Sequence, residues 1–200
     1  MDIPFLIIGL GNPGREYERT RHNAGFLLTD RLADDWHGVW QTEKKFRSRV
    51  ARADTDGGRV LLVQPQTYMN VSGEAVGPVQ KFYRVPPEKM LVAVDDADLP
   101  LGSIRLRPGG SSGGHHGLES VEQHIGTRDY PRLRLGIGRT DREKREIAGH
   151  VLGRFSVEEW ALFEKVLEQA VRQVNCWLRE GAESAMSQFN GPMAGQNTKE

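Results

Sequence analysis

Short apolar runs alternate with amphipathic stretches along this chain, and the alternation predicts an α/β fold. Each run has the length and the Val, Ile and Leu content of a buried strand. Between the runs, apolar residues recur at helical spacing, so we expect helices to connect the strands. The expected strands cover residues 5–10, 60–63, 90–94, 104–106 and 133–137, with a weaker one at 46–51, and the expected helices cover 24–36, 72–83 and about 118–125.

A long amphipathic helix is expected after Ser156. This serine is a good N-cap, and large apolar residues then recur at helical spacing for several turns. Such a stripe is typical of a helix face in the core and does not indicate a ligand site. Gly181 is expected to end the helix, and a shorter helix to follow as far as about Phe189. Ser72 is expected to cap the helix over 72–83 in the same way.

The length of the chain indicates one domain over residues 1–190 and a flexible tail over 191–200. Lys plus Arg equal Asp plus Glu at 27 each, so the net charge does not indicate a nucleic-acid partner. Distribution matters more, because nine basic residues stand against five acidic ones between positions 105 and 145. Arginine suits phosphate recognition, but the same excess is typical of a solvated surface.

Nothing in the composition indicates a membrane or an oxidising compartment. No apolar run approaches the ~20 residues needed to cross a bilayer, and no signal-peptide pattern opens the chain. The single Cys176 cannot form an intramolecular disulfide, and its apolar neighbours indicate a buried thiol on a helix. We therefore expect a cytoplasmic protein without membrane association.

The segment GLGNPGREYERTRHNAG over 9–25 is the strongest candidate for a functional site. It follows an apolar strand, and open α/β sheets carry their chemistry at the carboxyl ends of strands. Its glycines match the dinucleotide-binding pattern, which requires a helix that starts within the glycines. Pro13 and the charged residues over 15–21 look like a loop instead. A dinucleotide site is therefore not favoured, and a purely structural turn is the simpler alternative.

Three further polar residues lie where they can join this segment. His22 precedes a helix and follows Arg21, and both the helix dipole and this cation favour a neutral imidazole that can accept a proton. Asn70 lies at a second junction between a strand and a helix, and Asp95 ends the strand over 90–94, where its carboxylate can orient an imidazole. The alternative for the acidic residues is a solvated loop. Strand alternation points Asp96 away from Asp95, and Asp98 is expected to serve the turn.

A glycine-rich loop over 107–117 follows another strand and precedes a helix. Such loops bring backbone amides close to phosphates, although a lid without ligand contacts is equally compatible. Ser111 and Ser112 lack the G-x-S-x-G turn of a serine nucleophile. His115 and His116 could be combined with His22 as a zinc site, but adjacent histidines project in different directions. We therefore predict no metal.

Five ordered segments resemble the bacterial peptidyl-tRNA hydrolase family. They are GLGNPGREYERTRHNAG, QPQTYMNVSG, VDDADLPLGSIRLR, GGSSGGHHGL and PRLRLGIGR, and the resemblance extends from about Ile7 to Phe189. It implies a monomeric α/β fold with a central mixed sheet wrapped by helices. It also implies hydrolysis of the ester that joins a peptide to the 3′ end of tRNA, with no metal or organic cofactor.

The resemblance also implies a role for each site residue. His22 is the general base that activates water, Asp95 orients it, and Asn12 and Asn70 hold peptide and water. The tRNA is expected to bind through its acceptor stem and 3′ CCA end. The remaining positions implied to contact substrate are Tyr17, Tyr68, Met69, His116, Arg107 and Arg134, the last two at the tRNA 5′ phosphate.

One residue departs from the family pattern. The glycine-rich loop of the family usually ends G-G-H-N-G-L, and this chain has His116 in place of the asparagine. Imidazole can still donate to a carbonyl or a water. The departure leaves a non-catalytic RNA-binding relative of the same fold as the rival interpretation, but retention of His22, Asp95, Asn12 and Asn70 favours the hydrolase.

Overall fold

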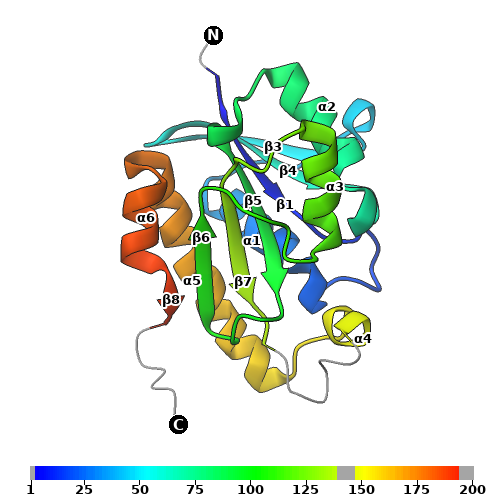
Figure 1. Cartoon of the computed structure of the whole chain (residues 1–200), viewed down its shortest axis with the longest axis vertical. Helices are drawn as coiled ribbons and strands as arrows, with labels where there is room; N and C mark the ends of the chain where they lie inside the picture. The colour runs from blue at the N-terminus through cyan, green and yellow to red at the C-terminus, as the bar shows by residue number, and fades with distance from the viewer. Residues whose placement is uncertain (1–2, 139–146, 194–200) are drawn as a thin grey trace.

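The computed structural model describes residues 3–138 and 147–193. Within those residues, eight strands form one sheet in the order β2-β3-β4-β1-β5-β7-β6-β8, and helices cover both faces (Figure 1). Strands β4, β1, β5 and β7 are parallel, and the outer strands pair antiparallel, so the predicted mixed α/β sheet is confirmed. The strands are β1 (Phe5–Gly9), β2 (Gln41–Glu43), β3 (Ser48–Thr55), β4 (Gly58–Pro65), β5 (Met90–Asp96), β6 (Ser103–Arg107), β7 (Arg132–Gly136) and β8 (Gly191–Pro192).

The predicted helices also form close to their expected bounds. Among the described strands and α-helices, β2, β8 and α4 were not predicted, because each is too short to give a periodic pattern. The helices are α1 (Ala24–Asp35), α2 (Gly73–Tyr83), α3 (His116–Ile125), α4 (Ile147–Leu152), α5 (Val157–Glu180) and α6 (Ala182–Phe189), and short 3₁₀ turns include η1 (Arg21–Asn23) and η3 (Met69–Val71).

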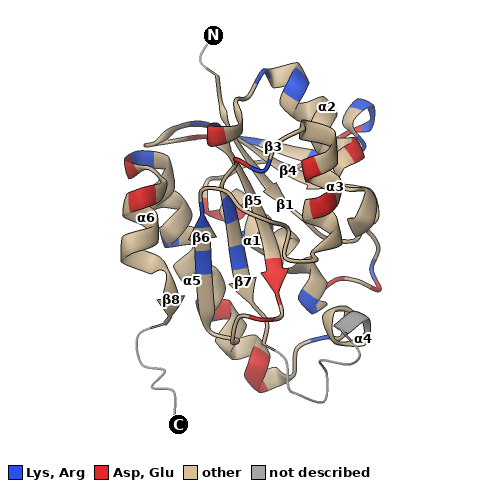
Figure 2. Cartoon of the chain, viewed as in Figure 1, with Lys and Arg blue, Asp and Glu red and all other residues tan. Residues whose placement is uncertain are grey.

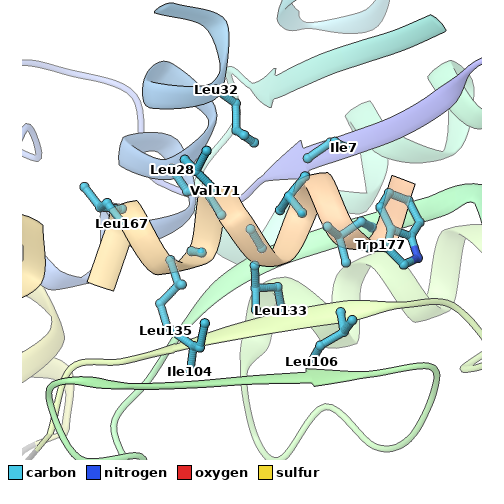
Figure 3. Packing of buried hydrophobic residues seen from close by; sticks show 14 of the residues in the cluster. Ile7, Leu28, Leu32, Ile104, Leu106, Leu133, Leu135, Leu167, Val171 and Trp177 are labelled. Atoms are coloured by element: carbon cyan, nitrogen blue, oxygen red, sulfur yellow. The ribbon is translucent and has the colours of Figure 1, made fainter. Parts of the chain in front are cut away.

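The sheet separates two apolar layers because successive side chains of a strand point to opposite faces. Along β1, Ile7 packs into the cluster formed with α1 and α5, whereas Leu6 and Ile8 pack into the cluster formed with α2 and α3. The stripe on α5 lies in the core as predicted, with Val171 among the residues packed against the sheet (Figure 3). Both faces of the parallel strands are therefore buried, which leaves their carboxyl ends as the exposed place for a site.

The two predicted serine caps have different outcomes. Ser156 caps α5 through a capping box, in which its Oγ accepts from Glu159 N at 3.2 Å and Glu159 Oε2 accepts from Ser156 N at 2.7 Å. Ser72 does not cap α2, because its Oγ donates to Met69 O at 2.8 Å. The chain enters α2 directly from η3, so the helix does not begin with a free first turn that a serine hydroxyl would cap.

The first residues of the predicted tail are held against the sheet, which corrects that prediction for Gly191–Pro192 and Met193. Gly191–Pro192 forms β8, which pairs with β6. The N–H of Met193 donates to Gly102 O in the turn before β6. Just before them, the Asn190 side chain takes the place of a neighbouring strand: its Oδ1 accepts from Leu106 N at 2.7 Å and its Nδ2 donates to Leu106 O at 3.0 Å. Residues 194–200 lie outside the described part of the chain.

Close approach of α1 to the sheet depends on Gly25. A Cβ at this position would lie 2.3 Å from Ala93 O and 2.5 Å from Leu10 N, both backbone atoms that cannot move alone. We expect Gly25→Ala to lower the free energy of unfolding by about 1–3 kcal/mol, measured by urea denaturation. Gly149→Ala is the matched control, because its added Cβ would have no heavy atom within 4 Å apart from its chain neighbours and the backbone of its own helix. Equal stability of the two variants would contradict this account.

Candidate active site

A cavity of about 690 Å³ opens where β1, β4 and β5 end. Figure 2 shows acidic residues at the end of β5 and basic residues along the neighbouring strands β6 and β7. Of the ten predicted site residues, Tyr17 and Arg107 are not among those lining this cavity, and both lie elsewhere on the surface, half-buried and exposed respectively. The other eight line it together: Asn12, His22, Tyr68, Met69, Asn70, Asp95, His116 and Arg134.

His22 and Asp95 form a hydrogen-bonded pair. His22 Nδ1 lies 2.9 Å from Asp95 Oδ1, and the exposed fractions of the two side chains are 17% and 3%. A carboxylate only accepts, so Nδ1 carries the proton and donates to Asp95. This tautomer leaves Nε2 as the basic nitrogen of the ring. The proximity that the sequence predicted is therefore present.

The shift of the His22 pKa is opposite to the predicted direction. Burial lowers the pKa, but the charge of Asp95 and its hydrogen bond together outweigh burial, so the pKa is raised above its ordinary value. Arg21, which was expected to favour the neutral ring, is paired with Glu159 at 2.7 Å. The pKa of Asp95 is held well below its usual range although burial opposes this, because His22 and His115 stabilise the carboxylate.

His115 is the site residue that sequence reasoning missed. Its Nε2 lies 3.1 Å from Asp95 Oδ1, so one carboxylate oxygen accepts from two imidazoles. Its Nδ1 accepts from Leu118 N at 3.4 Å as the N-cap of α3, which places the ring proton on Nε2. The available signal was its position before a predicted helix, where a side chain is often held by the first turn.

The arrangement fits proton sharing better than metal binding. Ligand atoms of His22, Asp95 and His115 lie within 4.8 Å of one another. A metal-bound histidine donates from its other ring nitrogen to an acceptor. The other nitrogen of His115 instead faces the Leu118 N–H. The donor set therefore gives no reason to change the prediction that the chain uses no metal.

Two asparagines hold the first loop against the second junction. Asn23 accepts from Asn12 N at 2.9 Å and donates to Asn12 O at 3.0 Å, which fixes the backbone of the loop. Asn12 Oδ1 accepts from Met69 N at 2.8 Å, so the two junctions meet as the sequence predicted. Asn12 itself lines the cavity, and its amide also carries two N–H donors. Asn70 is exposed and lines the same cavity from η3.

Arg134 fastens the glycine-rich loop to the sheet. Its guanidinium donates to Ser111 O at 3.0 Å, to Ser112 O at 2.9 Å and to Asp96 Oδ2 at 3.3 Å. Asp96 also serves the following turn, since its Oδ1 accepts from Asp98 N at 2.9 Å. The turn that Asp98 was expected to serve is therefore also held by the Asp96 carboxylate.

His116 and Tyr68 are among the cavity-lining residues that reach solvent. His116 is 77% exposed and its Nδ1 lies 3.0 Å from Glu119 Oε2. Tyr68 is 62% exposed, which leaves its ring available for contact with a planar ligand. Both lie on the rim of the cavity, away from the buried pair of His22 and Asp95.

The fold is α/β with one mixed sheet and a cavity at the carboxyl ends of its parallel strands, and the comparisons name the family. A sequence model described as "Peptidyl-tRNA hydrolase" matches residues 6–199. This chain belongs to the peptidyl-tRNA hydrolase family, whose reaction is hydrolytic recycling of peptidyl-tRNA. Within the described residues, no helix is long and apolar enough to span a bilayer.

The relatives are similar along nearly the whole chain. The peptidyl-tRNA hydrolase of Synechococcus sp. (strain JA-3-3Ab) is 48% identical, over 92% of this chain and 82% of the relative. That of Brevibacillus brevis is 46% identical, over 92% and 97%. A crystal structure of peptidyl-tRNA hydrolase from Acinetobacter baumannii has a TM-score of 0.89 and 41% identity, covering 96% of this chain and 97% of that one.

Proposed function

We propose that His22 is the general base of peptidyl-tRNA hydrolysis and that Asp95 orients it. The observation that carries the proposal is the 2.9 Å bond between His22 Nδ1 and the buried Asp95 Oδ1, which leaves Nε2 basic beside the cavity. Nε2 removes a proton from water, and the water oxygen attacks the ester carbonyl carbon. The bond from carbonyl carbon to ribose oxygen then breaks, and the imidazolium gives its proton to the departing ribose oxygen, which leaves as a hydroxyl. No covalent intermediate is needed.

Asn12 and Asn70 act as the donors that stabilise the developing oxyanion and read the peptide. Asn12 supports this role because its amide oxygen accepts from Met69 N, and its NH₂ group carries two N–H donors of the kind that an oxyanion needs. A substrate without the peptide amide would leave polar groups unpaired, which disfavours free aminoacyl-tRNA. Met69 and His116 line the cavity that receives the peptide and the 3′ end, and Tyr17 contacts the substrate outside this cavity.

Tyr68 and Arg107 contact the nucleic acid. The exposed ring of Tyr68 offers a surface on which a base of the 3′ CCA end stacks. Arg107 is exposed at the end of β6, one strand from Arg134 on β7, and the two receive the 5′ phosphate of the acceptor stem. Arg134 also places the glycine-rich loop beside that stem. The enzyme acts as a cytoplasmic monomer.

Substituting Arg107 tests the nucleic-acid contact. We expect Arg107→Ala to raise KM with kcat retained, and to reduce the slope of log KM against log salt concentration by about one, because one phosphate contact is lost. Steady-state kinetics at several salt concentrations measure this slope. Arg59→Ala is the matched control, since Arg59 is an exposed strand arginine beside Asp54, remote from the cavity. A slope unchanged by Arg107→Ala would remove Arg107 from the interface.

The activity is tested with tRNA carrying a labelled amino acid. We expect the purified protein to release the labelled amino acid from N-acetylaminoacyl-tRNA. The corresponding aminoacyl-tRNA, whose amino acid has a free α-amino group, should stay largely intact. Measuring tRNA binding in parallel distinguishes a hydrolase from a non-catalytic RNA-binding relative. Tight binding without cleavage would favour the non-catalytic RNA-binding relative.

A further inference from the structure

We propose that Arg21 is a positioning residue for His22, because it fastens the turn that carries His22 to the junction between α4 and α5. This inference rests on the proposed role of His22 as general base. His22 is the central residue of η1, a 3₁₀ turn that precedes α1. A turn of three residues does not hold a ring in place by itself, so its flanking residues decide where the imidazole lies.

Arg21 makes three hydrogen bonds to a segment more than 130 positions away. Its N–H donates to Gly153 O at 3.0 Å, its Nη1 donates to Arg154 O at 3.0 Å, and its Nη2 donates to Glu159 Oε2 at 2.7 Å. The residue is only 9% exposed. Backbone and side chain therefore bind the same junction together, which an exposed ion pair does not do.

The packing around the guanidinium is close. It lies over the ring of Phe155, 5.2 Å from the ring centroid. A Cβ at position 153 would lie 2.9 Å from Arg21 Nη1, so glycine leaves the space that this contact needs. Thr20, next to Arg21, forms an isolated β-bridge with Arg154. These contacts hold Arg21 in one arrangement and bury donors that a tRNA phosphate would require.

Glu159 makes the anchor rigid. Its Oε2 accepts from Ser156 N at 2.7 Å in the capping box as well as from Arg21. It belongs to the first turn of α5, whose apolar face packs in the core. Arg21 is thus attached to a helix that cannot shift without disturbing the core.

The same junction leads directly to the wall of the active site. Val151 and Leu152, at the end of α4, line the cavity. On the other side of His22, Asn23 binds both backbone groups of Asn12. His22 is therefore held from two sides, and Arg21 ties its position to the cavity wall formed by α4. Without the Arg21 guanidinium, the bonds to Arg154 O and Glu159 are lost, and only backbone contacts of Thr20 and Arg21 remain between this side of the turn and the junction.

We expect Arg21→Met to lower kcat by about tenfold to a hundredfold, because a small displacement of a catalytic group has effects of this size. KM for N-acetylaminoacyl-tRNA should stay within about twofold. Arg21→Lys should fall between wild type and Arg21→Met, since lysine can pair with Glu159 but cannot reproduce the planar fork. Glu159→Gln should lower kcat less, and the double variant should be no worse than Arg21→Met.

The matched control is Arg31→Met. Arg31 makes an exposed ion pair with Asp35 on α1, with 3.5 Å between Nε and Oδ1, and this change should leave kcat unaltered. Urea denaturation of every variant measures the folded fraction. Unaltered kcat in both Arg21→Lys and Glu159→Gln would overturn the proposal even if Arg21→Met fails to fold. A raised KM at constant kcat would assign Arg21 to RNA binding and also overturn it.

A substrate-free measurement separates this proposal from the proposed function. The pKa of the His22 ring can be measured by NMR titration. In the wild type, the contact with Asp95 raises this pKa. We expect Arg21→Met to move this pKa toward its ordinary value, since a displaced ring loses the carboxylate. An unmoved His22 pKa in folded Arg21→Met would refute the positioning role. Wild-type protein that fails to cleave N-acetylaminoacyl-tRNA would refute the proposed function alone.

Discussion

Replacing His22 by Ala is expected to lower kcat about 10²- to 10⁴-fold, the loss typical of a positioned general base. Among the described residues that line the cavity, none other offers a basic nitrogen in the same place: His115 Nε2 carries a proton donated to Asp95, and His116 lies on the exposed rim. Release of labelled N-acetyl amino acid from tRNA measures the effect. Binding of tRNA should persist, because the proposed nucleic-acid contacts lie elsewhere.

The control for this change is His37→Asn. His37 is an exposed histidine after α1 with φ of 55°, a conformation that asparagine tolerates well. Its substitution should leave turnover unchanged. If His22→Ala kept turnover within a few-fold of wild type, water would have to be activated by another group and the mechanism would be wrong.

Replacing Asp95 by Asn should have the second largest effect. It should cost less kcat than His22→Ala, since the base remains and only its orientation and polarisation suffer. The acid limb of kcat/KM should also move to lower pH. The reason is that Asp95 raises the His22 pKa while burial lowers it, and Asn removes the charge but leaves the burial. A base that loses its proton at lower pH stays active at lower pH.

The pH profile decides whether this explanation holds. We expect Asp54→Asn to leave the acid limb in place, because Asp54 is an exposed carboxyl paired with Arg59 at 3.7 Å, far from His22. An acid limb that stays put in Asp95→Asn, or moves to higher pH, would show that the Asp95 carboxylate does not set the His22 pKa.

The sequence predicts the frame of this site well because the signals are local. Apolar runs identify the strands that end near Asn12, Asn70 and Asp95, and parallel strands present such ends at one edge of a sheet. The contact of Asn12 Oδ1 with Met69 N follows from that topology. The capping box at Ser156 likewise depends on residues that are close in sequence.

Interactions between distant side chains escape this reasoning. The sign of the His22 pKa shift depends on a carboxylate 73 positions away, and the expected influence of Arg21 is absorbed by Glu159, 138 positions away. His115 and His116 are neighbours in sequence, yet one is buried against Asp95 and the other is exposed. Only the start of α3 decides which ring turns inward, and no pattern of apolar residues specifies it.

The contact between Asn190 and Leu106 also bears on the order in which the enzyme is completed during synthesis. Strand β6, which carries Arg107, is made halfway along the chain, but its outer edge is closed by Asn190 and β8 near the C-terminus. Until those residues leave the ribosome, the backbone N–H and C=O of Leu106 lack the hydrogen-bond partners that Asn190 provides. The proposed hydrolytic centre needs the chain as far as Glu159, which holds Arg21, so β6 and the exposed Arg107 gain their last edge contacts after the residues of that centre have been made.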